Sequence, residues 1–146
     1  MKRTAELRGL SEDHHHGLAL AQRAKRAAAG PAGHSTEEAW ADIERQFEAE
    51  LEPHFGIEES LLAPALQGQG ESELVSRLYE EHAALRECVG PSRGRSPADL
   101  LRFGELLERH IRFEERELFV VAEQRLGADA LRAVAQACHA RRVPRR

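Results

Sequence analysis

The 146-residue chain has few aromatic residues and only two cysteines, Cys88 and Cys138. Two cysteines without paired spacing indicate neither a disulfide scaffold nor a zinc ribbon. No stretch alternates apolar and polar residues at the period of two that a strand requires. The chain also lacks a signal peptide and any apolar run near the ~20 residues of a membrane-spanning helix. We therefore expect a cytoplasmic protein with no strands and no membrane partner.

The charge of the chain is also modest, with a formal net charge of −4 and a pI of about 6.1. A nucleic-acid-binding protein would usually carry a basic patch on one element, and none is present. We therefore expect no nucleic-acid partner. Basic residues do gather at the two ends of the chain, where we interpret them as solubilising tails: Lys2, Arg3, Arg141, Arg142, Arg145 and Arg146.

Alanine, leucine, glutamate and arginine dominate the composition, and all four favour helices. The length is typical of one domain, so we predict a single all-α domain spanning residues 1–146. Apolar residues at helical spacing, interrupted by glycine and proline, predict an up-and-down four-helix bundle. The four helices are expected at about 10–29, 36–67, 73–89 and 97–126, and a short fifth helix can follow at 128–139.

Capping signals support two of these helix starts. Ser35 to Glu38 has the pattern of a capping box, and Ser96 is a good N-cap with Pro97 in the first turn and Asp99 three residues on. Pro53 is the exception to a regular pattern. Because proline removes one backbone hydrogen bond, we expect the second helix to be distorted immediately before His54.

One motif occurs twice: His54 and Glu58 are followed, 56 residues downstream, by His110 and Glu114. Residues four apart project from nearly the same face of a helix, with a rise of about 6 Å between them. An imidazole and a carboxylate at this spacing can bind one metal ion or two adjacent ions. Two such helices facing each other would supply two histidines and two carboxylates, as in di-iron sites of helix bundles.

His14 and His82 are expected to complete the cluster, because each lies on the apolar face of its own helix. In an up-and-down bundle, depth can be counted from each connecting loop at about 1.5 Å per residue. On this count His14, His54 and His82 lie at similar depths, and His110 differs by about 9 Å. The predicted metal ligands are therefore His14, His54, Glu58, His82, His110 and Glu114.

Several alternatives remain open at this point. A single histidine on an apolar face is more often a hydrogen-bonded core residue than a ligand. Burying two glutamates without a cation would cost several kcal/mol, so a metal is expected, although Arg86 is available to neutralise them instead. His15 can replace His14, and Glu115 can replace Glu114. The remaining histidines and Glu59 are expected at the surface or behind the ligands.

These motifs together resemble the hemerythrin-like, or HHE cation-binding, family, and the resemblance covers nearly the whole chain. The matching segments are Asp13 to His16, His54 to Glu59, Glu81 to Arg86 and His110 to Phe119. The resemblance implies a four-helix bundle with a non-haem di-iron centre, Fe²⁺ or Fe³⁺, carrying an oxo or hydroxo bridge. It further implies that Glu58 and Glu114 bridge the metals and that the four histidines are terminal ligands. Zinc or manganese can occupy the same ligands.

The chain departs from the oxygen-carrying members of that family in two ways. They have a His-x3-His pair on the third helix, where this chain has Arg86, and a carboxylate five residues after the last histidine, where Glu114 comes at four. One iron is then left with an open position, or with His34 or Tyr79 as a substitute.

The resemblance therefore implies a protein that binds, senses or reduces oxygen, peroxide or nitric oxide rather than a simple oxygen carrier. The alternative is a metal-dependent sensing or protein-interaction module without catalysis. The sequence does not decide whether the protein is an enzyme, nor does it indicate a protein partner, a redox partner or an oligomeric state.

Overall fold

The computed structural model describes residues 3–30, 36–91 and 94–142, and these residues form five helical rods without a strand. Two of the rods contain wider π-helical turns, labelled η. The elements are α1 (Arg8–Ala29); α2 (Thr36–Gln46), η1 (Phe47–Leu51), α3 (Glu52–Ile57), η2 (Glu58–Leu62) and α4 (Ala63–Gly68); α5 (Ser72–Cys88); α6 (Pro97–Phe113), η3 (Glu114–Leu118) and α7 (Phe119–Arg125); and α8 (Ala128–Arg142).

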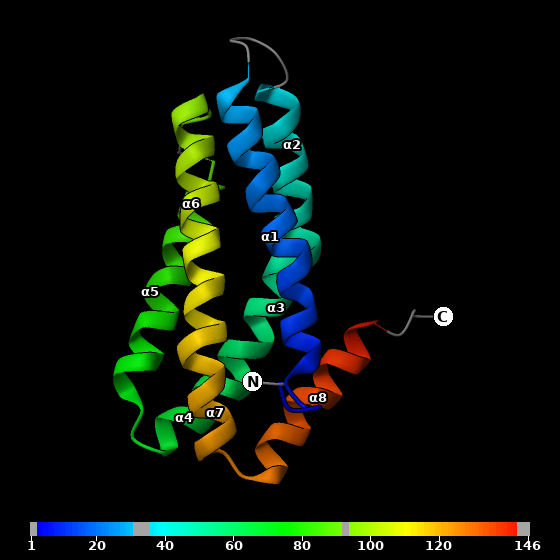
Figure 1. Ribbon diagram of the computed structural model, residues 1–146, viewed down its shortest axis with the longest axis vertical. Helices are drawn as coiled ribbons and strands as arrows, with labels where there is room; N and C mark the ends of the chain where they lie inside the picture. Colours follow the sequence, from blue (N-terminus) through cyan, green and yellow to red (C-terminus); the bar gives the residue numbers. More distant parts are fainter. Residues whose placement is uncertain (1–2, 31–35, 92–93, 143–146) are drawn as a thin grey trace.

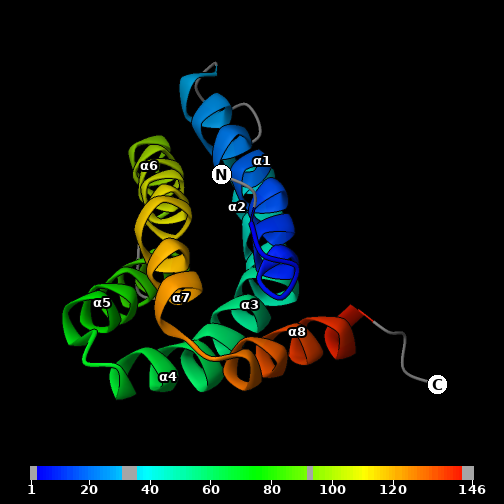
Figure 2. The same ribbon diagram turned by 60° about the horizontal axis from the view of Figure 1, so that its bottom comes forward.

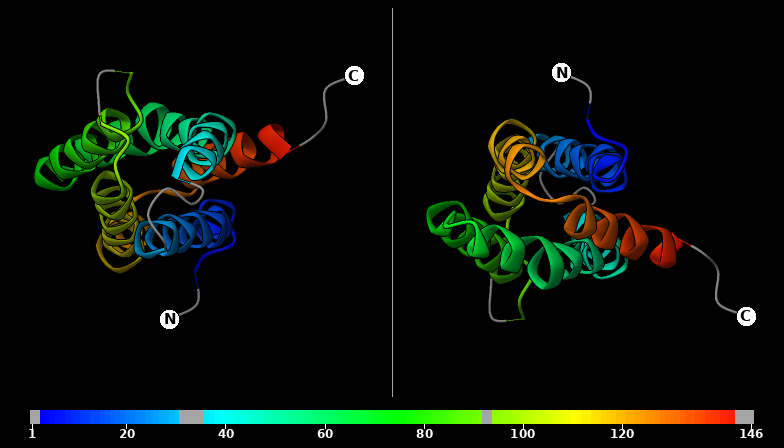
Figure 3. Two further views of the ribbon diagram at one scale, coloured as in Figure 1. Left: turned by 90° about the horizontal axis from the view of Figure 1, so that it is seen from above. Right: turned by 90° about the horizontal axis from the view of Figure 1, so that it is seen from below.

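The first four rods run alternately up and down, as Figure 1 shows by the change of colour along each. Viewed from either end, they surround a common interior (Figure 3). The all-helical prediction is confirmed, and the expected helix ends lie within about two residues of those observed. No helix among the described residues is long and apolar enough to cross a membrane.

The start of α6 has the expected capping box. The Ser96 hydroxyl accepts a hydrogen bond from the backbone N–H of Asp99, and the Asp99 carboxylate accepts one from the backbone N–H of Ser96. These contacts satisfy backbone donors that a helix start otherwise leaves without partners. The other predicted box begins at Ser35, which lies outside the described residues.

The second rod is distorted by π-helical turns rather than interrupted. The turn η1 ends at Leu51, two residues before Pro53, and η2 ends at Leu62, two residues before Pro64. A proline has no N–H to donate, and its ring crowds the carbonyl of the preceding turn, so a wider turn relieves that crowding. The distortion predicted near His54 therefore takes the form of a π turn that ends three residues before it.

The third π turn, η3, has no proline. It begins at Glu114, just as η2 begins at Glu58, so both glutamates of the repeated motif open a π turn. Single π turns are frequent at functional sites because they re-aim the side chains around them.

A polar layer divides the interior into two apolar clusters. On α1, buried His14 lies between Leu10 of one cluster and Leu20 of the other. The same order recurs on the other three rods, where buried polar residues lie between Leu51 and Leu62, between Leu78 and Leu85, and between Leu107 and Leu118. The four rods therefore place their buried polar residues at one common level.

The close approach of α1 to α6 depends on a glycine. A Cβ atom at Gly104 would lie 2.8 Å from the backbone oxygen of Ala21, so a larger residue would force the two helices apart. This spacing brings His14 on α1 within reach of Glu114 at the end of α6.

The predicted fifth helix is present as α8 and extends three residues beyond its expected end. It lies across the lower end of the rods (Figure 2), in contact with α1, α3 and η2. Its residues Leu131, Val134 and Cys138 are buried against the lower apolar cluster, so α8 closes that end of the interior.

Candidate metal centre

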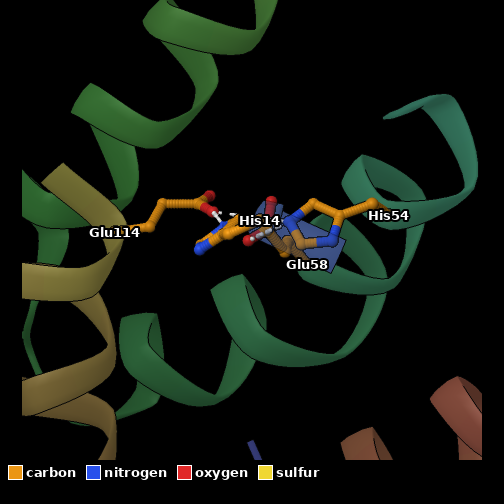
Figure 4. A group of neighbouring side chains, drawn as sticks. All are labelled: His14, His54, Glu58 and Glu114. Atoms are coloured by element: carbon orange, nitrogen blue, oxygen red, sulfur yellow. Dashed lines mark hydrogen bonds and ion pairs between the residues drawn. The ribbon is translucent and has the colours of Figure 1, made fainter. Parts of the chain in front are cut away.

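The six predicted ligands lie together in the polar layer, and all six are buried. They come from all four long rods: His14 from α1, His54 from α3, Glu58 from η2, His82 from α5, His110 from α6 and Glu114 from η3. Figure 4 shows His14, His54 and the two glutamates converging on one point. The structure thus brings together the residues that the motifs predicted, and their role as ligands remains a prediction.

The cluster consists of two overlapping groups of four residues. One group contains His14 and His54, and the other contains His82 and His110. Glu58 and Glu114 belong to both groups, and within each group the potential ligand atoms lie within 4.8 Å of one another. This arrangement provides two adjacent sites, each with two imidazoles and a share of two carboxylates.

All four imidazoles direct the Nε2 atom at the two glutamates. The shortest contact joins His14 Nε2 and Glu114 Oε1 at 2.7 Å, and His110 Nε2 lies 3.0 Å from Glu114 Oε2. Glu58 is approached at 3.1 Å by the Nε2 atoms of both His54 and His82. Each glutamate therefore lies between histidines of both groups, as a bridging carboxylate would.

The opposite ring atom, Nδ1, contacts a second carboxylate in every case. These contacts are His14 to Glu115 at 2.6 Å, His54 to Asp13 at 3.0 Å, His82 to Glu59 at 2.7 Å and His110 to Glu81 at 2.6 Å. An Nδ1–H that donates to a carboxylate fixes the ring orientation and leaves the Nε2 lone pair for a metal. We call these four acidic residues the outer carboxylates.

The outer carboxylates form a closed ring around the bundle. Asp13 on the first rod supports a histidine of the second rod, and Glu59 on the second supports one of the third. Glu81 on the third rod supports a histidine of the fourth, and Glu115 on the fourth supports His14 on the first. Each outer carboxylate is adjacent in sequence to a predicted ligand, so a single turn supplies both a ligand and a support for the neighbouring rod.

An arginine holds each outer carboxylate in turn. The pairs are Arg3 with Glu115 at 3.3 Å, Arg141 with Asp13 at 2.9 Å, Arg86 with Glu59 at 2.8 Å and Arg77 with Glu81 at 2.8 Å. The interpretation of Arg3 and Arg141 as solubilising tails was therefore wrong, because their side chains are only 16% exposed and both reach the centre through a carboxylate.

The charges in the cluster shift its pKa values strongly. Burial lowers the pKa of His82 and of His110, but contacts with Glu58 and Glu114 outweigh it and raise these pKa values to about 9 and about 10. Burial also lowers the pKa of His14 and of His54, and contacts with Glu114 and Glu115 for His14, and with Glu58, Asp13 and Glu114 for His54, outweigh it and raise both pKa values. Burial acts to raise the pKa of Glu114, and the surrounding histidines hold it well below its usual value.

The cluster fits a bound cation. With Nδ1–H engaged outward, four Nε2 lone pairs converge on two carboxylates, and only a proton or a metal ion can relieve the repulsion between them. Three buried atoms there, Glu58 Oε2, His110 Nε2 and Glu114 Oε2, lie within 3.1 Å of a group of the cluster but are not aligned for a hydrogen bond. Arg86 does not neutralise the glutamates, because it binds Glu52 and Glu59 instead.

The residues of the open alternatives lie in different places. His14 lies in the cluster while His15 is exposed, and Glu114 lies in it while Glu115 supports the His14 ring. Tyr79, one of the two proposed substitute ligands, is 44% exposed, and its hydroxyl donates to the backbone oxygen of Glu59. The hydroxyl is therefore turned away from the centre. His34, the other proposed substitute, lies outside the described residues.

Sequence reasoning missed Phe55. Its ring stacks on His82 with the centroids 3.9 Å apart, and the Arg86 guanidinium lies 5.4 Å from the centroid of the same ring. Phe55 thus covers one face of the His82 ring, and Arg86, four residues after His82, lies over the Phe55 ring. Its position next to His54 was the only signal in the sequence. That signal was not enough, because adjacency to a ligand does not show which way an aromatic ring turns.

The comparison with protein families agrees with the motif analysis. Residues 5–122 match the Hemerythrin HHE cation binding domain family. The comparisons with curated proteins and with solved structures gave no significant match. The family match covers most of the chain and all six predicted ligands, while the whole of α8 lies outside it. The chain therefore belongs to the hemerythrin HHE cation-binding domain family.

Proposed function

We propose that this protein is a cytoplasmic non-haem di-iron protein that binds, senses or reduces a small oxidant, namely oxygen, peroxide or nitric oxide. The observation that carries the proposal is the paired geometry of the cluster, with two imidazoles on each side of two shared glutamates. In this proposal the first four rods act as an up-and-down four-helix bundle around the two metals, and α8 is an addition to it.

The donor set is compatible with iron, and it argues against calcium and magnesium. Imidazole nitrogens and carboxylate oxygens suit iron, zinc and manganese, whereas calcium and magnesium prefer oxygen ligands alone. When bound, a pair of ferrous ions would supply the electrons for binding or reducing an oxidant. Glu58 and Glu114 would hold the two ions together, because each glutamate contacts histidines from both groups.

The four histidines are divided equally between the two groups, and this division affects where an oxidant would bind. Each group offers two imidazoles and shares two carboxylates, which leaves coordination positions for a small molecule at both metals. The sequence predicted an open coordination position at one iron, and we now propose open positions at both metals. An adjacent cavity of about 10 Å³ has room for about one water-sized molecule.

The surrounding residues would keep bulk water away from that cavity. It is lined on its apolar side by Leu51, Phe55, Leu107 and Ile111, all of which are buried. The outer carboxylates would meanwhile hold the Nδ1 protons, so that each ring presents its Nε2 lone pair inward. The site is therefore arranged to exchange small uncharged ligands and to exclude larger ones.

Metal content and the optical spectrum of anaerobically purified protein test this proposal. We expect about two irons per chain, and we expect near-ultraviolet bands of an oxo-bridged pair to appear when air is admitted. Protein that binds no metal even after anaerobic reconstitution with ferrous iron would refute it. Continued consumption of peroxide or nitric oxide with added reductant would then identify a catalyst, whereas a single stoichiometric reaction would identify a sensor or carrier.

A further inference from the structure

Three neighbouring cavities form a series that leads from the surface to the metal centre. A groove of about 570 Å³ includes Glu12, His16 and Arg141 in its lining. The second cavity, of about 20 Å³, shares His16 and Glu50 with the groove. The third is the cavity of about 10 Å³ beside His14, His54 and Glu114. Gly17 and Leu51 line both inner cavities, and Asp13 lines all three, so each cavity shares wall residues with the next.

We propose that divalent cations reach the centre through this series, between α1 and η1, and that Arg141 on α8 closes its mouth. The proposal rests on the cation-binding function of the centre and concerns how the centre is filled. The inner end carries Glu114 Oε2 and His110 Nε2, both buried and without a hydrogen-bond partner. A cation that arrives there can bind these two atoms.

The chemistry of the mouth favours a cation over an anion. Glu12, Asp13 and Glu50 bring three carboxylates to the groove, against one arginine, and His16 adds an imidazole. Carboxylates at the opening of a narrow passage raise the local concentration of cations and therefore the rate of their capture. Asp13 is a lining residue of all three cavities.

The narrow neck of the route is open only because Gly17 has no side chain. A Cβ atom there would lie 2.8 Å from Ile111 Cδ1 and 4.0 Å from Leu51 Cδ2, inside the space that the two inner cavities share. A space of 10–20 Å³ holds about one water molecule. An ion must therefore shed most of its water before it passes.

Arg141 is placed to open and close the mouth. It lies in the last turns of α8, whose C-terminal end rises beside α1 and α3 (Figure 1). Its guanidinium bridges the two walls of the route, binding Asp13 Oδ2 on α1 at 2.9 Å and Glu50 Oε2 on η1 at 2.6 Å. It also donates to the backbone oxygen of Glu50 at 3.2 Å. Release of this one side chain would unlink the two walls.

The rates of Co²⁺ uptake and loss by the full-length, metal-free protein test the route. Uptake is followed by the visible absorption of Co²⁺, and loss is followed after addition of excess chelator. Gly17→Ala should slow both rates at least about threefold, because a close-packed neck does not readily accommodate a methyl group. Alanine favours a helix more than glycine does, so this variant should fold. An unchanged uptake rate in Gly17→Ala would overturn the route.

Glu12→Gln at the exposed mouth gives a second test that does not depend on packing. Its uptake rate at low ionic strength should fall about two- to fivefold, and the difference should disappear in high salt. Glu80→Gln, which removes an exposed carboxylate from α5, is the matched control and should bind Co²⁺ at the wild-type rate. Equal slowing in the two variants would show that net charge, and not this mouth, governs uptake.

Arg141→Gln tests the gate, and Arg132→Gln on the same helix is its control. In high salt, an opened gate raises the uptake rate, and the release rate rises at least as much because Asp13 also loses the arginine that holds it. If Arg141 only positioned Asp13 behind His54, release alone would accelerate and affinity would fall, which would overturn the gate. Absence of bound Co²⁺ in the wild type at equilibrium would instead refute the centre itself, and with it the route.

Discussion

The two halves of the metal centre have the same donors and different supports. His14 and His54 form one half, and their outer carboxylates are held by Arg3 and Arg141, which come from opposite ends of the described chain. In the other half, His82 and His110 depend on Arg86 and Arg77, which lie within the single helix α5. The first half is therefore complete only when both chain ends are docked, whereas the second is completed by the bundle itself.

The supports also differ in burial. Arg3 and Arg141 are each 16% exposed, against 42% for Arg77 and 35% for Arg86. An exposed ion pair contributes little because water screens it, so the more buried pairs of the first half are expected to matter more. The comparison teaches that identical ligands need not give identical sites, because the segments that orient them differ in how firmly they are held.

The largest expected effect comes from removing Glu114, a residue that both halves share. Glu114→Ala should abolish binding of both metals, because Glu114 lies within 4.0 Å of the Nε2 atoms of all four histidines. Metal analysis after anaerobic reconstitution measures this directly, and circular dichroism checks that the helices persist. Two irons per chain in this variant would show that Glu114 is not a bridge.

A smaller effect, confined to one half, is expected from single histidine substitutions. His54→Ala should remove the metal of the first half and His82→Ala that of the second, each leaving about one metal per chain. Metal analysis of the two variants in parallel makes each the control for the other. If either variant lost both metals, the two halves would not be separate sites, and their different supports would not matter separately.

The sequence predicted which residues meet in the polar layer, because helical spacing fixes which residues share a face. His54 with Glu58, and His110 with Glu114, are four residues apart, and no other structural information was needed to pair them. The choice of His14 over His15 followed from the apolar neighbours on α1. The fold class followed from composition and from the glycine and proline signals between helices.

The contacts between the arginines and the outer carboxylates could not be predicted from the sequence, for a physical reason. Arg141 and Asp13 are 128 positions apart, and their contact depends on how α8 crosses the bundle. Spacing within one helix carries no information about such a contact. The π turns at Glu58 and Glu114 were missed because a single wider turn leaves the helical pattern of the sequence intact.

The raised pKa values predict how stability depends on pH when no metal is bound. His82 and His110 have folded-state pKa values of about 9 and about 10, above the usual 6.5. Their charged forms therefore stabilise the fold fully below about pH 6.5, and this contribution is lost as the pH rises through 9 to 10. The melting temperature of the metal-free protein should fall by several degrees over this interval.

Metal binding should remove most of that pH dependence. A metal on Nε2 requires the neutral imidazole, so the loaded protein has no such protons to lose between pH 6.5 and 10. Thermal melts of the metal-free and zinc-loaded proteins at matched pH values provide the comparison. A metal-free melting temperature that stayed flat or rose over this range would show that the histidines are not held as cations by the glutamates.

The smallest expected effect comes from the outer carboxylates, and it tests the difference in support most closely. Asp13→Asn and Glu59→Gln each keep the shape of the side chain and remove the charge that orients one histidine, His54 or His82. Loss of such a support typically lowers metal affinity about 10- to 100-fold.

We expect the loss of affinity to be confined to one of the two sites in each variant. We expect it to be larger for Asp13→Asn, because Asp13 also ties Arg141 of α8 to the bundle. Competition with a chelator of known affinity measures both constants. Equal losses in the two variants would mean that the supports from the chain ends and from α5 are equivalent, despite their different origins.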